Sequence, residues 1–191
     1  MTDTKSQDLK SGNWFADLIM AFKPDEVQVT GTPAEMTHTA SWEAFSVSTV
    51  AGLPPGFFGW LTILPEIIAV TKIQINLIYK IAKYYDKVSV VNPTFILLIF
   101  CNDVGIATKG IVHNLGKRMI VRTLGSKALR PLAQKVGAMI GVKITQRVIG
   151  RTIPFLLAPV FGVLSKSLTT QIGKQAEKLF SKDIEVETEA E

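Results

Sequence analysis

Residues 52–87 read GLPPGFFGWLTILPEIIAVTKIQINLIYKIAKYYDK, and this stretch decides the fold class. Its first part, residues 52–64, is apolar and is interrupted by three glycines and two prolines. From Pro65 on, apolar residues recur every three or four positions, which predicts a long amphipathic helix. Pro65 suits the first helical turn, and Glu66 beside it suits the positive end of the helix dipole. The apolar face contains Ile67, Ile68, Thr71, Ile75, Ile78, Ala82 and Tyr85.

The opposite face of this predicted helix is basic. It contains Lys72, Asn76, Lys80, Lys83 and Lys87 at the same helical period. A wide apolar face with an all-basic polar face predicts burial on one side and an anionic surface on the other.

The composition is that of one hydrophobic domain with tails. The chain has 191 residues, of which 47% are hydrophobic and only 19% are charged, and its mean hydropathy is +0.28. The single cysteine, Cys101, excludes an internal disulfide framework and fits a reducing compartment. The polar start of the chain does not resemble a secretory signal, so the cytoplasm is the default location.

Charge is strongly segregated along the chain. Between residues 104 and 176 there are twelve Lys or Arg and no acids, whereas the first 66 residues hold eight acids and three lysines. Such a basic block attracts anionic lipid, nucleic acid or an acidic partner. The residues expected to form the lipid or partner surface are Lys72, Lys80, Lys83, Lys87, Lys117, Arg118, Arg122, Lys127, Arg130, Lys143, Arg147 and Arg151.

The N-terminal region, residues 1–40, is expected to be flexible apart from a short amphipathic helix over residues 13–23. Trp14 and Phe15 share its apolar face, so this helix either lies in a membrane interface or docks on the main domain. Residues 24–40 read as a linker, and Ser41 offers an N-cap for a helix over residues 42–51. Residues 41–182 form the predicted helical domain, and the acidic tail, residues 183–191, is expected to be disordered.

Three stretches lack formal charge: residues 44–65, 88–102 and 152–165. A membrane-spanning helix needs about 20 apolar residues. The first stretch is long enough but is broken by proline and glycine, and the other two are shorter and contain proline. We therefore expect hydrophobic hairpins, re-entrant segments or core helices. The aromatic residues expected to insert in a membrane are Trp14, Phe15, Phe57, Phe58, Trp60, Phe155 and Phe161.

The rest of the chain also predicts helices. Residues 88–91 form a short β-like run, after which Asn92 and Pro93 start a helix that is expected to extend over residues 95–124. A basic amphipathic helix is predicted over residues 126–150, and its GxxxG spacing at residues 137–141 permits close helix approach. A last helical region covers residues 153–182. The predicted fold class is an all-α, single helical bundle with Gly/Pro-interrupted hydrophobic hairpins and disordered termini.

Catalytic and cofactor motifs are not apparent. His38 and His113 lack partners at metal-ligand spacing, and a nucleophilic pair of Cys101 and His113 is disfavoured because a lone buried cysteine is usually inert. No phosphate-binding loop occurs. We expect no enzyme activity, no metal and no cofactor. The bases recur along amphipathic helices and form neither an arm nor a recognition helix, so we expect no nucleic-acid partner.

The order of these residues resembles the EcsC family of bacterial helical proteins and a related family of helical membrane-associated domains. The resemblance spans about residues 42–181. It is carried by residues 52–54 (GLP), Glu66, Gln74, residues 78–86 (IYKIAKYYD), residues 147–154 (RVIGRTIP), Gly162 and residues 172–180 (IGKQAEKLF). The family commonly has Asp at the position of Glu66. It has Gly where this chain has Asp86 after Tyr85, which suggests a different helix exit.

The resemblance implies a membrane-associated helical protein, whose founding member is tied to an ABC-transporter operon, and it carries over no catalytic residues. We expect a non-enzymatic protein that binds anionic lipid or a membrane protein complex at the cytoplasmic face, a location at which it could assist transport or secretion. The alternatives are a soluble adaptor that docks an acidic partner in the cytoplasm and a pore-forming or membrane-disrupting protein. The oligomeric state is left open.

Overall fold

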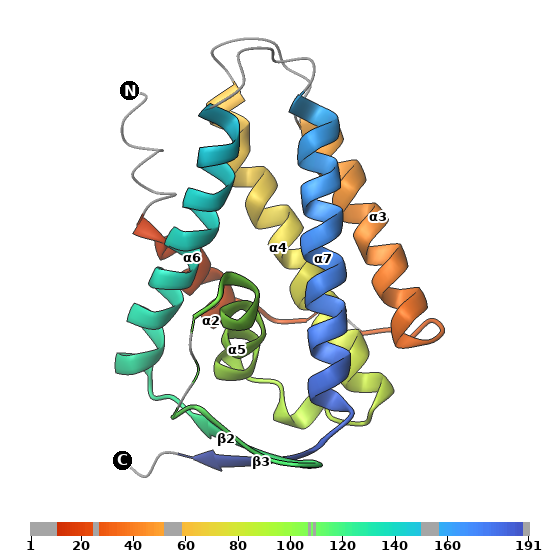
Figure 1. Ribbon diagram of the computed structural model, residues 1–191, viewed down its shortest axis with the longest axis vertical. Helices are drawn as coiled ribbons and strands as arrows, with labels where there is room; N and C mark the ends of the chain where they lie inside the picture. Colours follow the sequence, from red (N-terminus) through yellow and green to blue (C-terminus); the bar gives the residue numbers. More distant parts are fainter. Residues whose placement is uncertain are drawn as a thin grey trace.

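The computed structural model describes residues 11–24, 27–51, 59–106, 108, 110–149 and 157–188. Four long helices run along the long axis of the molecule (Figure 1): α3 (Pro33–Ala51), α4 (Gly59–Tyr84), α6 (Ser126–Ile149) and α7 (Leu157–Phe180). Helices α3, α4 and α7 pack on one another, while α6 packs on the shorter helices α2 (Asn13–Ala21) and α5 (Pro93–Val104). The predicted helical character is confirmed.

Four ends of the long helices lie together at one end of the molecule. The end of α3, the start of α4, the end of α6 and the start of α7 all lie at this end, at the top of Figure 1. We call this the upper end. A small sheet lies at the opposite end. At 1.5 Å per residue, α4 alone spans about 39 Å between the two ends.

Helix α5 lies in the centre of the molecule. All residues from Thr94 to Cys101 are buried, so the uncharged run at residues 88–102 contains a core helix, one of the alternatives that its sequence allowed. The helix starts as predicted, since Asn92 Oδ1 accepts a hydrogen bond of 3.0 Å from the Phe95 N–H and Pro93 occupies the first turn. The ring of Phe95 stacks on Phe180 of α7 with 5.0 Å between centroids.

The sheet corrects the prediction of an all-α fold. Strands β1 (Val112–Leu115) and β2 (Arg118–Thr123) form an antiparallel hairpin, and β3 (Asp183–Thr188) pairs parallel to β2. The predicted helix over residues 95–124 therefore ends at Val104, and part of the tail expected to be disordered is a strand. Met119 and Val121 of β2 are buried against the core, and this burial holds the sheet on the helices.

Helix α3 starts within the predicted linker at residues 24–40. Thr32 and Glu35 form a capping box: Glu35 Oε2 accepts from the Thr32 N–H at 2.8 Å, and Thr32 Oγ1 accepts from the Glu35 N–H at 3.3 Å. Helix α4 also starts earlier than predicted, so Pro65 lies inside it rather than in its first turn. Residues 88–90 form a 3₁₀ turn, η1 (Val88–Val90), rather than a β-like run.

Helix α2 docks on the core. Phe15 is fully buried and Trp14 is 8% exposed, so these two residues pack in the protein instead of forming a surface anchor. The close approach of α2 to α6 depends on Gly137, because a Cβ at this position would lie 2.6 Å from Phe15 Cβ and 2.8 Å from the Gly12 carbonyl oxygen. The first glycine of the GxxxG spacing thus serves a contact within the chain.

Candidate functional site

The predicted basic surface is divided among separate parts of the molecule. Lys72, Lys80 and Lys83 follow one face of α4, whereas Lys117, Arg118 and Arg122 belong to the hairpin at the sheet end. Along α6, Lys127 and Lys143 lie about 24 Å apart. Arg147 belongs to α6 near the upper end, and Arg151 lies outside the described residues.

Four of these bases hold the chain together. Lys83 Nζ donates to the Val27 carbonyl at 2.7 Å, and Lys87 Nζ donates to the Phe180 carbonyl at 2.8 Å and to the Lys182 carbonyl. Arg118 pairs with Glu185 across the sheet, and Arg130 pairs with Asp17 of α2 at 2.8 Å. The four bases therefore make contacts between segments of the same chain, which the sequence did not indicate.

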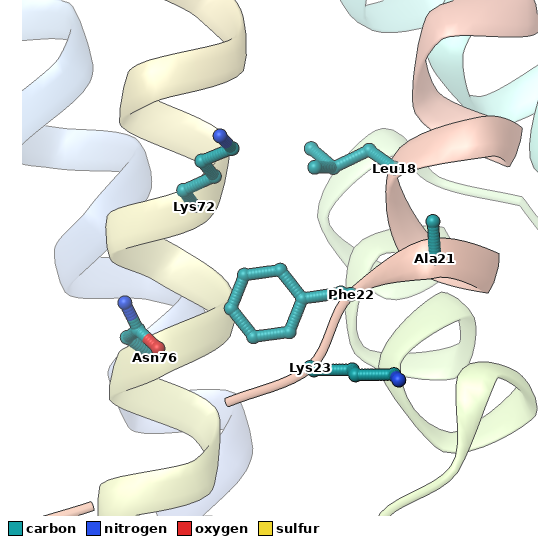
Figure 2. A pocket seen from close by; sticks show the side chains of 6 residues that line it. All are labelled: Leu18, Ala21, Phe22, Lys23, Lys72 and Asn76. Atoms are coloured by element: carbon teal, nitrogen blue, oxygen red, sulfur yellow. The ribbon is translucent and has the colours of Figure 1, made fainter. Parts of the chain in front are cut away.

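A pocket of about 460 Å³ lies between α2 and α4 (Figure 2). Leu18, Ala21 and Phe22 of the α2 segment form its apolar side, and the ring of Phe22 points toward α4. Lys72 and Asn76 contribute the polar side from α4, with Lys23 below Phe22. Phe22 also stacks on Tyr79 with 6.1 Å between ring centroids, which fixes the wall of the pocket.

The two ammonium groups of this pocket do not converge. In Figure 2, Lys72 and Lys23 lie on either side of the Phe22 ring, so their charges border an apolar surface from two directions. This arrangement suits an extended amphipathic segment with acidic groups better than a single small anion. The volume falls within the usual range for ligand pockets, about 300–1,000 Å³.

A second group of polar side chains lies between α3, α4 and α7. The hydroxyls of Ser48 and Ser165 are 2.6 Å apart, and the Gln74 amide donates to Thr169 Oγ1 at 3.2 Å. Ser48, Gln74 and Thr169 are buried. We call these four residues and Glu66 the polar row. From the sequence, Glu66 was notable for its place at the predicted helix start and, like Gln74, for the family resemblance. The partners of these two residues on α3 and α7 were missed.

Glu66 is the titratable member of the polar row. Burial raises the pKa of its carboxyl to about 7, and a hydrogen bond from the Ser48 hydroxyl opposes this rise. When Glu66 is ionised, Ser48 donates its one hydroxyl proton to the Glu66 carboxylate. Ser165 therefore supplies the proton of the Ser48–Ser165 hydrogen bond. Ser165, Ser48 and Glu66 thus form one directed hydrogen-bond chain across three helices.

Cys101, His113 and His38 lie on three different elements, α5, β1 and α3. Cys101 is buried in α5, and burial raises the pKa of its thiol to about 11, which disfavours the nucleophilic thiolate. His113 is exposed on β1. His38 accepts a hydrogen bond of 3.0 Å from the indole N–H of Trp42, and Lys166 Nζ lies 3.4 Å from the centre of the Trp42 ring. This last contact is a cation–π interaction between α3 and α7.

The other aromatic residues expected to insert in a membrane are only partly placed. Phe57, Phe58 and Phe155 lie outside the described residues. Trp60 belongs to the first turn of α4, and Phe161 belongs to the beginning of α7, so both are near the upper end.

Comparison of the chain with family models, with characterised proteins and with solved structures gives no match. Within the described ranges, no helix has both the length and the apolar character needed to cross a membrane. The same part of the chain contains no group of three or more His, Cys, Asp or Glu residues placed to hold a metal ion.

Proposed function

We propose that this protein is a non-enzymatic, membrane-associated helical protein that attaches to the cytoplasmic face of a membrane through its upper end. The observation that carries the proposal is the convergence at this end of the end of α3, the start of α4, the end of α6 and the start of α7. The segments that join these helix ends belong to the uncharged stretches 44–65 and, in large part, 152–165. The described helix ends that flank the two Gly/Pro-interrupted hydrophobic segments therefore lie at the same end of the molecule.

The position of the bases restricts which of them contact lipid in this orientation. Lys143 lies about 9 Å from the end of α6, whereas Lys72 lies about 20 Å from the end of α4. A head-group layer is only about 5–8 Å thick on each side of the hydrocarbon. Of the bases that the structure describes along α4 and α6, Lys143 and Arg147 lie nearest to the upper end. The proposal therefore assigns lipid contact to these two, with each base contributing about 1 kcal/mol near an anionic surface.

The resemblance to the EcsC family supports the same location, since members of that family are membrane-associated helical proteins. Shallow insertion of hydrophobic segments is compatible with the absence of a spanning helix in the described ranges. Support for a transport or secretion complex as the neighbouring partner comes only from the resemblance.

Sedimentation with vesicles of phosphatidylcholine and phosphatidylglycerol tests this proposal. Lys143→Glu and Lys127→Glu are matched variants, because both residues are exposed on α6 but lie at opposite ends of the helix. We expect binding at low salt and a loss of affinity of about tenfold or more for Lys143→Glu. Lys127→Glu should bind like the parent protein. Failure to bind anionic vesicles at low salt, or equal losses in both variants, would contradict the proposal.

A second candidate function is an adaptor that docks an acidic protein partner. The basic face of α4 and the pocket bordered by Lys72 and Lys23 favour it, because charge and apolar surface occur together there. Lys72→Glu should then abolish recovery of one stoichiometric partner and leave vesicle binding unchanged. Release of dye from vesicles on protein addition would instead indicate the pore-forming alternative.

A further inference from the structure

The hydrogen-bond chain of the polar row lies close to the upper end. Along their helix axes, Ser48 lies about 5 Å from Ala51, Glu66 about 11 Å from Gly59 and Ser165 about 12 Å from Leu157. The chain links the three helices α3, α4 and α7. Any deeper entry of this end into a bilayer brings the Glu66 carboxylate closer to hydrocarbon.

We propose that Glu66 is a proton-dependent latch, whose protonation allows the upper end to enter the membrane more deeply. This inference rests on the proposed membrane association and adds its regulation. An ionised carboxyl that keeps part of its hydration loses that hydration when hydrocarbon covers the site. The neutral acid loses much less, so membrane entry and proton uptake are coupled.

The protonated acid also retains its place in the polar row. A carboxylate only accepts hydrogen bonds, whereas a carboxylic acid also donates one. The acid can therefore donate to Ser48, which then donates to Ser165 and reverses the direction of the chain. The three helices stay joined in both protonation states, so the latch changes charge without requiring separation of the helices.

Burial is the main influence on the pKa of the Glu66 carboxyl. The resolved causes are burial and the Ser48 hydroxyl, and no charged group is among them. The titratable and charged residues on the elements that pack against α4 are Asp17 on α2, Glu35, His38 and Glu43 on α3, and Lys166, Lys174, Glu177 and Lys178 on α7. Helix η1 contributes none.

The sign of the coupling follows from linkage. The carboxyl of the free protein has a pKa of about 7, and contact with hydrocarbon raises it further. Membrane affinity is then highest below pH 7. Above pH 7 it falls by up to tenfold per pH unit until the pKa of the membrane-bound state is reached.

Vesicle affinity measured at pH 6 and pH 8.5 tests the latch. The comparison is made in a background with His38→Gln and His113→Gln, which contains no histidine. We expect about tenfold stronger binding at pH 6 than at pH 8.5. Glu66→Gln should bind at the stronger level at both pH values. Glu43→Gln, at an exposed carboxyl of α3, and Glu66→Asp should keep the pH dependence.

The outcomes separate the two proposals. Binding that does not change with pH in the protein with Glu66, or pH dependence that survives in Glu66→Gln, would overturn the latch and leave membrane association intact. Absence of binding by all variants at both pH values would overturn the membrane association itself. Circular dichroism of Glu66→Gln and Glu66→Asp shows whether each variant is folded before its affinity is compared.

Discussion

The hydroxyl oxygens of Ser48 and Ser165 lie 2.6 Å apart and join two helices that are 117 residues apart in the chain. Ser48 is fully buried, so its hydroxyl has little access to water as an alternative partner. A buried polar group that loses its partner costs about 1–3 kcal/mol. This pair is therefore a sensitive test of the packing of α3 against α7.

Ser165→Ala should lower the free energy of unfolding by about 1 kcal/mol, because the Ser48–Ser165 hydrogen bond is lost while Ser48 keeps its hydrogen bond to Glu66. Urea denaturation measures this change. Ser167→Ala is the matched control, since Ser167 is exposed on the same helix and should change stability by less than about 0.5 kcal/mol. Equal midpoints for the two variants would show that the Ser48–Ser165 contact is not formed in solution.

Glu66→Gln should make stability less dependent on pH. The Glu66 carboxyl has a pKa of about 7 in the folded protein, compared with its usual 4.5. Its contribution to stability is thus complete below pH 4.5 and is lost as the pH rises to about 7. We expect the variant to be about 1–2 kcal/mol more stable than the parent at pH 8, a value reduced for residual solvation of the carboxyl. Guanidinium denaturation at pH 5 and pH 8 measures this difference. An equal difference in the free energy of unfolding between parent and variant at both pH values would contradict the prediction.

Lys87→Met should destabilise the protein by about 1–2 kcal/mol, because the Lys87 ammonium group satisfies the carbonyls of Phe180 and Lys182 where α7 ends. Its vesicle affinity should equal that of the parent protein, although the sequence placed Lys87 in the lipid surface. Lys72→Met on the exposed face of α4 serves as the control for stability. A stable Lys87→Met protein with weakened lipid binding would restore the original assignment.

Asp86→Gly should stabilise the protein by about 0.5–1 kcal/mol. Asp86 has a φ of 55°, and the Lys87 N–H donates to the Ala82 carbonyl at 2.8 Å, which is the hydrogen bond of a Schellman motif at the end of α4. The helix exit thus requires the left-handed conformation that glycine adopts without strain. A lower thermal midpoint for Asp86→Gly would show that the aspartate makes a compensating contact.

The elements that could be predicted from the sequence are those specified by local patterns of residues. The Asn92–Pro93 start of α5 and the limits of α6 follow from capping and periodicity. The sequence also contains the capping box of Thr32 and Glu35, but residues 24–40 were predicted as a linker because of their Pro-rich composition. The hairpin at Gly116 and Lys117 was missed because apolar residues on both sides of it also fit a helical pattern.

The candidate site depended on contacts that no local pattern encodes. Strand β3 forms because Asp183–Thr188 returns to β2 in parallel, a pairing over about 65 residues of chain. The polar row likewise needs α3, α4 and α7 side by side before Ser48, Glu66 and Ser165 meet. Pairing and burial of distant segments decide such contacts, so hydrophobic periodicity cannot predict them.

The most direct test of the account is the membrane depth of Trp60, which lies in the first turn of α4 at the upper end. A protein with Trp14→Phe and Trp42→Phe leaves Trp60 as the only tryptophan. A protein with Trp14→Phe and Trp60→Phe leaves Trp42, which is 45% exposed on α3. In vesicles with spin-labelled lipids, the account predicts strong quenching of Trp60 by shallow labels and little quenching of Trp42. Equal quenching of both, or quenching of Trp42 alone, would contradict attachment through the upper end.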